Sequence, residues 1–120
     1  MLVATGSASA NMRLSFVADH NEAAAKRGAE IYGKPTNIRR DAISALSDAT
    51  IPCDVFVEAT NSVVAAYDYC MAAIHRNAHC VLMNAEVDLF LGHLLRDAAK
   101  ERNVIVTSDA GDQHGGRACK

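Results

Sequence analysis

Four short polar segments of this chain each follow an apolar run, and their side chains are of the kinds that bind cofactors or move protons. The first segment begins with Asp19, directly after the alternating run 13–18. An acidic residue at the end of a strand is the group that dinucleotide-binding folds use to hydrogen-bond a ribose diol. An acidic charge that meets the positive end of the following helix is an equally good interpretation of Asp19.

The other three segments are residues 58–62 (EATNS), 84–88 (NAEVD) and 109–115 (DAGDQHG). Hydroxyl and amide side chains at a helix N-terminus, as in 58–62, can accompany free N–H groups that meet a cofactor phosphate or amide. Helix capping explains the same residues and, for this segment taken alone, is the better account. The two carboxylates of 84–88 could bind a metal or act as general acid and base. Solvated loop charges explain any one segment, but four at one edge of a sheet indicate a site.

The elements that must position these segments are predicted from hydrophobic periodicity. Continuous apolar runs are typical of parallel strands buried on both faces, and the runs here recur about every 25 residues, which suits a series of βαβ units. The predicted order is strand 13–18, helix 22–32 capped by Asn21 and Gly33, edge strand 34–38, helix 41–49, strand 55–59, helix 62–77, strand 80–84, a helix capped by Asp88, and strand 104–108. This order predicts an α/β fold with an open parallel sheet, in which ligands bind outside the carboxyl ends of the strands.

Composition narrows the class of protein. The chain has 120 residues, 50% of them hydrophobic, and a net charge of −2, so it suits one domain and lacks the basic excess that holds nucleic acid. No apolar run is long enough to cross a membrane, and we expect a cytoplasmic protein. The four cysteines form no C-x-x-C pair, which argues against a zinc knuckle or a thioredoxin-type redox pair.

Residues 54–115 resemble the nucleotide-binding domain of homoserine-dehydrogenase-like oxidoreductases. The resemblance rests on VFVEAT at 55–60, HCVLMNAEVD at 79–88 and GDQ at 111–113, and it covers roughly residues 12–115. Within that family the chain looks closest to the group with an extra antifreeze-like (SAF) domain, which includes deoxyxylulose-phosphate-reductoisomerase-like enzymes of isoprenoid biosynthesis. The resemblance implies a Rossmann domain that binds NAD or NADP and transfers hydride to or from a small carbonyl or hydroxy substrate.

The resemblance also implies roles for individual residues. The cofactor-binding residues that it implies are Asp19, Ala59, Thr60, Asn61 and Asn84, with 59–61 near the nicotinamide. A lysine follows the asparagine in homoserine dehydrogenases and in the reductoisomerases, but Ala85 stands there in this chain. The homoserine reaction therefore does not follow from the resemblance. Glu86 becomes the candidate catalytic acid, and Asn84 is the second candidate catalytic residue.

Two further expectations concern the cofactor and a metal. The Asp19 carboxylate repels the extra phosphate of NADP and so favours NAD, but relatives often carry Asn-Arg nearby and prefer NADP. His20 takes the basic place here, which leaves NAD and NADP both open. Asp112 is similar to the strand-end acids that hold a divalent ion in reductoisomerases, so the resemblance implies it as a metal ligand.

The start of the chain departs from the family pattern. A dinucleotide-binding domain begins with a strand and a G-x-G-x-x-G turn that cradles the pyrophosphate. Residues 1–11 offer only Gly6, and they are too few for a strand plus the crossover of a dozen or more residues that parallel strands need. We interpret 4–11 as the end of the family's first helix. We therefore expect the central strand and its glycine-rich loop to be missing, which would leave two half-sheets with unpaired edges.

These observations predict one partial NAD(P)-binding domain over 1–120, with a core at 12–109 and a tail at 110–120. We expect a fragment of a longer NAD(P)-dependent dehydrogenase or reductase, which acts on a small molecule and either forms a homo-oligomer that fills the gap or binds dinucleotide very weakly. A non-catalytic association module that uses exposed sheet edges, or a remnant without cofactor binding, is the alternative. A receiver-type domain that binds magnesium is a distant third, because no lysine follows the last strand.

Overall fold

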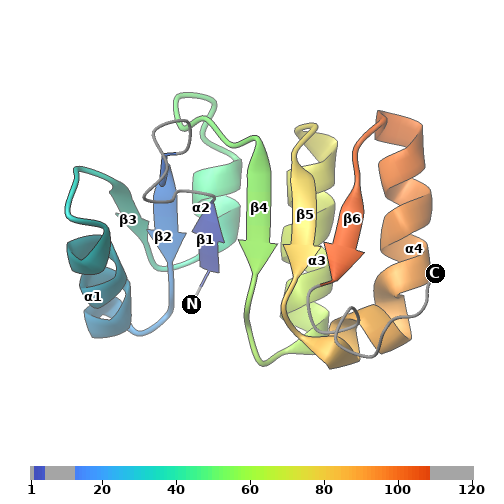
Figure 1. The fold of residues 1–120 in the computed structure, drawn as a ribbon, viewed down its shortest axis with the longest axis horizontal. Helices are drawn as coiled ribbons and strands as arrows, with labels where there is room; N and C mark the ends of the chain where they lie inside the picture. The colour runs from blue at the N-terminus through green and yellow to red at the C-terminus, as the bar shows by residue number, and fades with distance from the viewer. Residues whose placement is uncertain (1, 5–12, 109–120) are drawn as a thin grey trace.

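A six-stranded sheet with strand order β3-β2-β1-β4-β5-β6 forms the centre of the protein (Figure 1). The structure, a computed structural model, describes residues 2–4 and 13–108. The strands are β1 (Leu2–Ala4), β2 (Phe16–Ala18), β3 (Asn37–Arg39), β4 (Val55–Glu58), β5 (His79–Leu82) and β6 (Val106–Ser108). The helices are α1 (Glu22–Tyr32), α2 (Ala42–Leu46), α3 (Val63–His75) and α4 (Ala85–Arg102).

Five of the strands run in one direction. β2 pairs with β3, and β4 with β5 and β5 with β6, all in parallel register. β1 is antiparallel to both of its neighbours, β2 and β4, so those two share a direction with each other. The prediction of an open, largely parallel α/β sheet is therefore confirmed. Because the five parallel strands end at the same edge, the segments that follow them are brought together at the lower edge of Figure 1.

The expectation that the central strand is missing is wrong. β1 fills the gap between β2 and β4, with Val3 opposite Val17 on one side and Val57 on the other. The length argument holds only for a parallel strand, which needs a long crossover; an antiparallel neighbour can be reached by a short connection. The sheet is therefore continuous and not split into two halves. The expected helix end over 4–11 is also wrong at Ala4, which is in β1; residues 5–11, including Gly6, lie outside the described residues.

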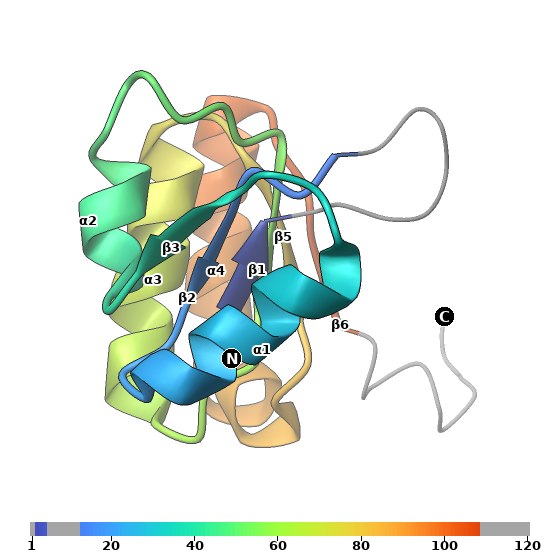
Figure 2. The same ribbon diagram turned by 90° about the vertical axis from the view of Figure 1, so that its left-hand side faces the viewer.

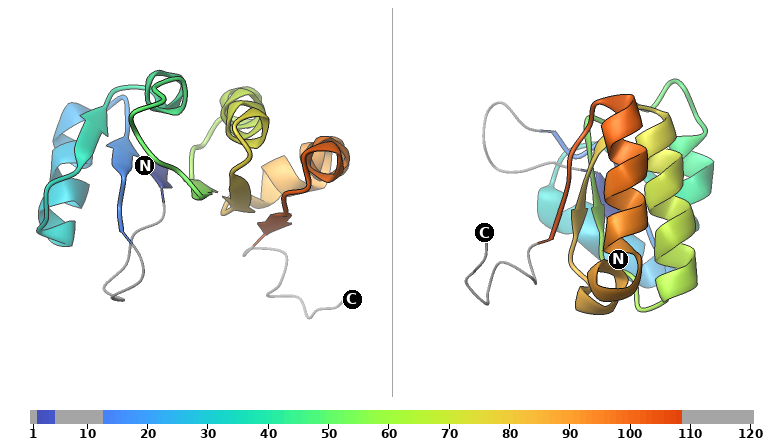
Figure 3. Two further views of the ribbon diagram at one scale, coloured as in Figure 1. Left: turned by 90° about the horizontal axis from the view of Figure 1, so that it is seen from above. Right: turned by 90° about the vertical axis from the view of Figure 1, so that its right-hand side faces the viewer.

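The helices cover the two faces of the sheet unequally. Figures 2 and 3 show α2, α3 and α4 side by side on one face, while α1 lies on the other, against β2 and β3. In the part of the chain that the structure describes, no helix covers the α1 side of β4, β5 and β6. The main core accordingly lies under α2, α3 and α4, with the rings of Phe16 and Phe56 stacked at 6.2 Å between centroids. A smaller core of Leu14, Val17 and Ala25 lies under α1.

The caps of α1 match the sequence prediction. The Asn21 side chain accepts a hydrogen bond from the Ala24 N–H, as an N-cap does. Gly33 ends the helix with φ of 78°, a left-handed conformation that costs glycine little. Both ends of this helix are thus fixed by residues that can be read in the sequence.

The start of α4 differs from the prediction. Its N-cap is Asn84 and not Asp88, so the helix begins about one turn earlier than expected. The Asp88 carboxylate instead forms an ion pair with Arg96, 2.6 Å away, which lies two turns further along the same helix. The pair passes over Gly92, where a Cβ atom would lie 2.5 Å from Asp88 Oδ1 and from Arg96 Nη1. The absence of a side chain at residue 92 makes this contact along the helix possible.

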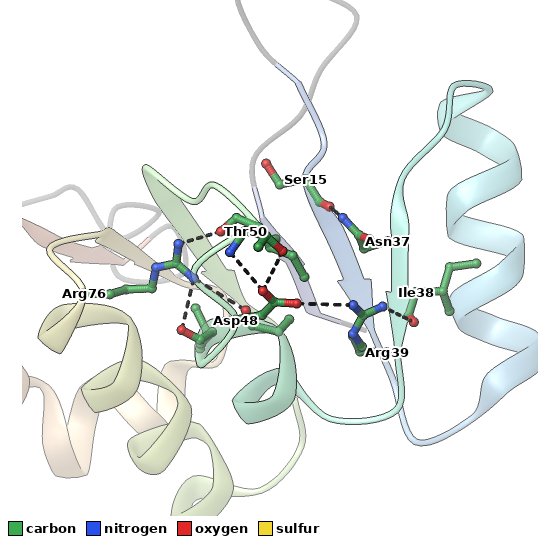
Figure 4. A network of polar contacts seen from close by, with 10 residues as sticks. Ser15, Asn37, Ile38, Arg39, Asp48, Thr50 and Arg76 are labelled. Carbon is green, nitrogen blue, oxygen red and sulfur yellow. Dashed lines mark hydrogen bonds and ion pairs between the residues drawn. The ribbon is translucent and has the colours of Figure 1, made fainter.

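A polar network ties α2 to the end of α3 (Figure 4). Arg76, the C-cap of α3, donates hydrogen bonds to the carbonyl oxygens of Leu46 at 3.0 Å and Ile51 at 2.5 Å. Asp48 accepts from the N–H and hydroxyl of Thr50, at 2.9 and 2.6 Å. A more exposed ion pair of 3.7 Å joins Asp48 to Arg39. The network fixes the chain between α2 and β4 against the end of α3.

Candidate functional site

Two clefts lie side by side along the carboxyl edge of the parallel strands and share one wall. The first has a volume of about 430 Å³ and is lined by residues 18–20, 40–41 and 59–62 with Ala65 and Tyr69. The second, of about 510 Å³, is lined by residues 59–61 and 83–86. Both volumes are within the range of ordinary small-molecule sites. The shared wall, residues 59–61, is the segment between β4 and α3.

Asp19 stands at the first cleft, directly after β2. Its Oδ1 accepts a hydrogen bond from the Asn21 N–H at 2.9 Å, and its own N–H donates to the Arg39 carbonyl oxygen at 3.1 Å. These contacts continue the β2–β3 pairing by one residue and fix the half-buried carboxylate at the strand end. Asp19 thus lies in the cleft, as the sequence predicted, and it also takes part in the start of α1.

Part of the lining of the first cleft comes from residues that the sequence analysis missed. Arg40 and Asp41 follow β3 there, just as Asp19 follows β2, so the strand-end rule could have found them if it had been applied to the short edge strand. Asp41 is also the N-cap of α2 and accepts from the Ile43 N–H at 2.7 Å. The first cleft is therefore lined by the exposed residue Arg40 and by Asp41 as well as by Asp19.

Tyr69 closes the back of the first cleft and was also missed. Only 8% of the residue is exposed, and burial, followed by the charges of Asp41 and Asp68, raises the pKa of its phenol. The phenol therefore keeps its proton as a hydrogen-bond donor. Its spacing from Ser62 and Ala65 (i, i+3, i+7) places the three on one face of α3, which is the signal that could have revealed it.

Hydrogen bonds with the end of β4 and with the segment after β5 hold the shared wall in place. Glu58, the last residue of β4, is fully buried, and its Oε2 accepts from the Thr60 N–H at 2.7 Å and from the Thr60 hydroxyl. The Thr60 carbonyl oxygen in turn accepts from Asn84 Nδ2 at 2.9 Å. That bond joins the segment after β4 to the segment after β5. The structure thus brings together Thr60 and Asn84, two residues that the sequence placed at one site.

The second cleft contains both candidate catalytic residues. Asn84 Oδ1 accepts from the Glu86 N–H at 2.9 Å, which caps α4 and leaves the exposed Glu86 side chain at the cleft. Ala59 and Asn61 lie in the same wall, so every candidate for cofactor binding or catalysis lines one of the two clefts. The structure brings these residues to one edge of the sheet because each comes one to four residues after a strand.

The metal prediction has a different outcome. Asp112 lies outside the described residues. Among residues 2–4 and 13–108 there is no group of three or more histidine, cysteine or acidic side chains that could hold a metal ion. Asp88, which the sequence paired with Glu86, directs Oδ1 to Arg96 and does not line the cleft. A shared carboxylate site at 84–88 is therefore not formed.

The buried cysteines are part of the core, as predicted for Cys70 and Cys80. Neither residue is exposed, and the Cys80 thiol lies 3.8 Å from the Cys70 carbonyl oxygen. A hydrogen bond with Cys80, and then burial, raise the pKa of the Cys70 thiol well above its ordinary value. The Cys70 thiol is therefore a poor nucleophile, and neither cysteine lines either cleft.

Comparison with protein families decides the lineage. The family model described as homoserine dehydrogenase, NAD binding domain, matches residues 2–108, from the start of β1 to the end of β6. The chain belongs to this family. This homoserine-dehydrogenase-type domain is thus a nucleotide-binding oxidoreductase domain of Rossmann type, and its two clefts lie where such a sheet binds its cofactor. No curated protein and no solved structure matches the domain significantly. Within the described residues, none of the helices has the length and apolar character to cross a membrane.

Proposed function

We propose that this domain binds NAD across the two clefts, with the adenosine end in the first and the nicotinamide end in the second. The hydrogen bond from Asn84 to the Thr60 carbonyl oxygen carries the proposal, because it joins the two clefts through one wall. The Asp19 carboxylate suits the ribose diol, and the buried phenol of Tyr69 supplies a donor at the back of the same cleft. Residues 1–11 contain a single glycine, Gly6, so the sequence there does not show the G-x-G-x-x-G turn that binds the pyrophosphate in the family.

The proposal favours NAD over NADP. A 2′-phosphate would bring negative charge against the Asp19 carboxylate, which two backbone contacts hold in place. Arg40, which lines the same cleft, would offset part of that repulsion, because guanidinium groups pair well with phosphate. Repulsion of the 2′-phosphate by Asp19 and its attraction to Arg40 together set the preference for NAD over NADP. Replacing Asp19 with a neutral residue should therefore shift the preference toward NADP.

The second cleft suits hydride transfer with a small carbonyl or hydroxy substrate. The nicotinamide supplies the hydride, while the chain's own residues orient the substrate and move the proton. Glu86 is exposed at the cleft and is the group that would give a proton to, or take one from, the substrate oxygen. Asn84 fixes the Glu86 backbone and faces the same space. The finer kinship with SAF-domain and reductoisomerase-like enzymes, and with it a place in isoprenoid biosynthesis, stays a prediction from the sequence resemblance.

The expectation of a homo-oligomer needs a different structural reason. It rested on a gap in the sheet that a second copy would fill, and β1 fills that position within the chain. Association through sheet edges, as in the alternative of a non-catalytic module, is therefore proposed only for the outer strands β3 and β6. Light scattering over a range of concentrations tests it, because an association module would gain mass without any dinucleotide.

Isothermal titration with NADH and NADPH tests the proposed function. We expect saturable binding with NADH the tighter ligand, and Asp19→Ser to weaken NADH binding about tenfold because it removes one charged hydrogen-bond acceptor. The same variant should reduce or invert the preference for NADH over NADPH. Asp97→Ser, which removes an exposed carboxylate of α4 outside both clefts, is the matched control and should bind like the parent. Absence of saturable binding by the parent chain would refute the proposal.

A further inference from the structure

Glu58 is an unusual residue at the end of a central strand. It has no exposed surface, and it shares the helix-covered face of the sheet with Phe56, two residues earlier. Burying a carboxylate costs free energy unless partners compensate it. Within the described residues, Oε1 has no hydrogen-bond partner, and both donors to Oε2 belong to Thr60. An apolar residue would pack here at lower cost, so Glu58 has a role other than filling the core.

The contacts of Glu58 lead directly to both clefts. Its side chain holds the N–H and the hydroxyl of Thr60, while the carbonyl of the same residue accepts from Asn84. Asn84 then accepts from the Glu86 N–H at the start of α4. The peptide groups on both sides of Thr60 are therefore fixed, and a chain of hydrogen bonds runs from the buried carboxylate to the backbone of the candidate catalytic acid.

The main-chain contacts of Glu58 strengthen the same connection. Its carbonyl oxygen accepts from the Met83 N–H at 2.9 Å, which extends the β4–β5 pairing up to the residue before Asn84. One residue thus sets the separation of the two strand ends through its backbone and the shape of the shared wall through its side chain. Thr60 lines both clefts, so a change in its orientation alters both at once.

We propose that Glu58 is a positioning residue for the dinucleotide site: its buried carboxylate holds Thr60, and through Asn84 it fixes the wall shared by the two clefts. The inference rests on the proposed cofactor binding and deepens it. Glu58 touches neither cleft and acts only through Thr60. Preorganisation of this kind lowers the ordering cost that a ligand would otherwise bear on binding.

Two substitutions separate positioning from structural support. Glu58→Gln keeps a carbonyl oxygen that can accept from both Thr60 donors. Glu58→Met has a similar length but no acceptor, and it removes the buried oxygen that lacks a partner, so we expect it to remain folded. Glu101→Met makes the same chemical change at an exposed position of α4 outside both clefts and serves as the control. Thr60→Val, which replaces the hydroxyl with a methyl group and keeps the backbone N–H, gives a second test should Glu58→Met lose its cooperative thermal transition.

The readouts are the dissociation constant for NADH and the hydrogen-exchange rate of the Glu86 amide measured by NMR. We expect Glu58→Gln and Glu101→Met to bind within about twofold of the parent, and Glu58→Met to bind about tenfold more weakly. The Glu86 amide should exchange faster in Glu58→Met and at the parent rate in Glu58→Gln. Thr60→Val should weaken NADH binding by a smaller factor, in the same direction.

The two measurements distinguish the failure of this inference from that of the proposed function. A parent chain that binds no NADH would refute the proposed function, and the exchange rate of the Glu86 amide would still test the connection from Glu58. Glu58→Met with parent-like binding and parent-like exchange would overturn the positioning role. Equal loss of binding in Glu58→Gln and Glu58→Met would overturn it as well, because the conservative variant must rescue a role that depends on the acceptor oxygen.

Discussion

Replacement of Arg76 by methionine tests how α2 and the segment before β4 are held against the end of α3. The guanidinium donates to the carbonyl oxygens of Leu46 and Ile51 at 3.0 and 2.5 Å, whereas its contact with Ala45 at 3.5 Å is too long to count. A hydrogen bond from a charged donor contributes about 1.5–3 kcal/mol. Because Arg76 is half-buried and water can partly replace it, we take the lower end for each bond. Arg76→Met should therefore lower the free energy of unfolding by about 3 kcal/mol.

The measurement is urea denaturation followed by circular dichroism at 25 °C, with an unchanged m-value as the sign of an intact folded state. A loss of this size shifts the melting temperature of a domain of this length by roughly 10 °C. Arg39→Met is the control, because its ion pair with Asp48 is 3.7 Å long with side chains 32% and 34% exposed, and such pairs contribute about 0–1 kcal/mol. If Arg76→Met costs no more than Arg39→Met, the role assigned to the network in Figure 4 is refuted.

Three further predictions concern single residues. Gly92→Ala should raise the free energy of unfolding, measured in thermal melts, by up to about 1 kcal/mol. The gain in helix propensity at residue 92 exceeds the loss of the Asp88–Arg96 ion pair that passes over it. A clear destabilisation would contradict this. Hydrogen bonds from Thr50 hold the pKa of Asp48 below 3.8, so its stabilisation is present above that pH and lost as the pH falls further. Asp48→Asn should accordingly be less stable than the parent at pH 5, with the gap closing toward pH 2; a constant gap would argue against it. Burial raises the pKa of Cys53 to about 11, so its alkylation at pH 8, followed by peptide mass spectrometry, should be about a hundredfold slower in the folded chain than in urea, and equal rates would contradict it.

Much of this fold can be predicted from local patterns. The bounds of α1 follow from Asn21 and Gly33, residues whose side chain and backbone freedom suit one end of a helix each. The parallel strands follow from apolar runs that no amphipathic helix would show. The start of α4 was misjudged because Asn84 and Asp88 are both good caps, and only the tertiary contact of Asn84 with Thr60 selects between them.

Some residues of the candidate site could also be predicted from local patterns, whereas others depend on contacts between distant segments. Asp19, Thr60 and Glu86 could be placed because a parallel sheet gathers strand ends at one edge. The spacing of Tyr69 places it on one helix face with Ser62 and Ala65, but that face becomes part of a cleft only when β2 and β4 lie on either side of β1, so the sequence analysis missed it. The role of Glu58 was equally hidden, because burial of a strand-end carboxylate depends on the helix that packs over it.

The place of β1 in the sheet also constrains the order in which the protein can assemble during synthesis. β1 leaves the ribosome before both of its partners, and it pairs with β4 only after the whole segment from β2 to α2 has been made. β2 and β3 can meet each other early, but the sheet cannot close around β1 until Phe56 and Val57 are available. A nascent chain halted before β4 would therefore expose one side of β1, and completion of the sheet would coincide with formation of the wall that both clefts share.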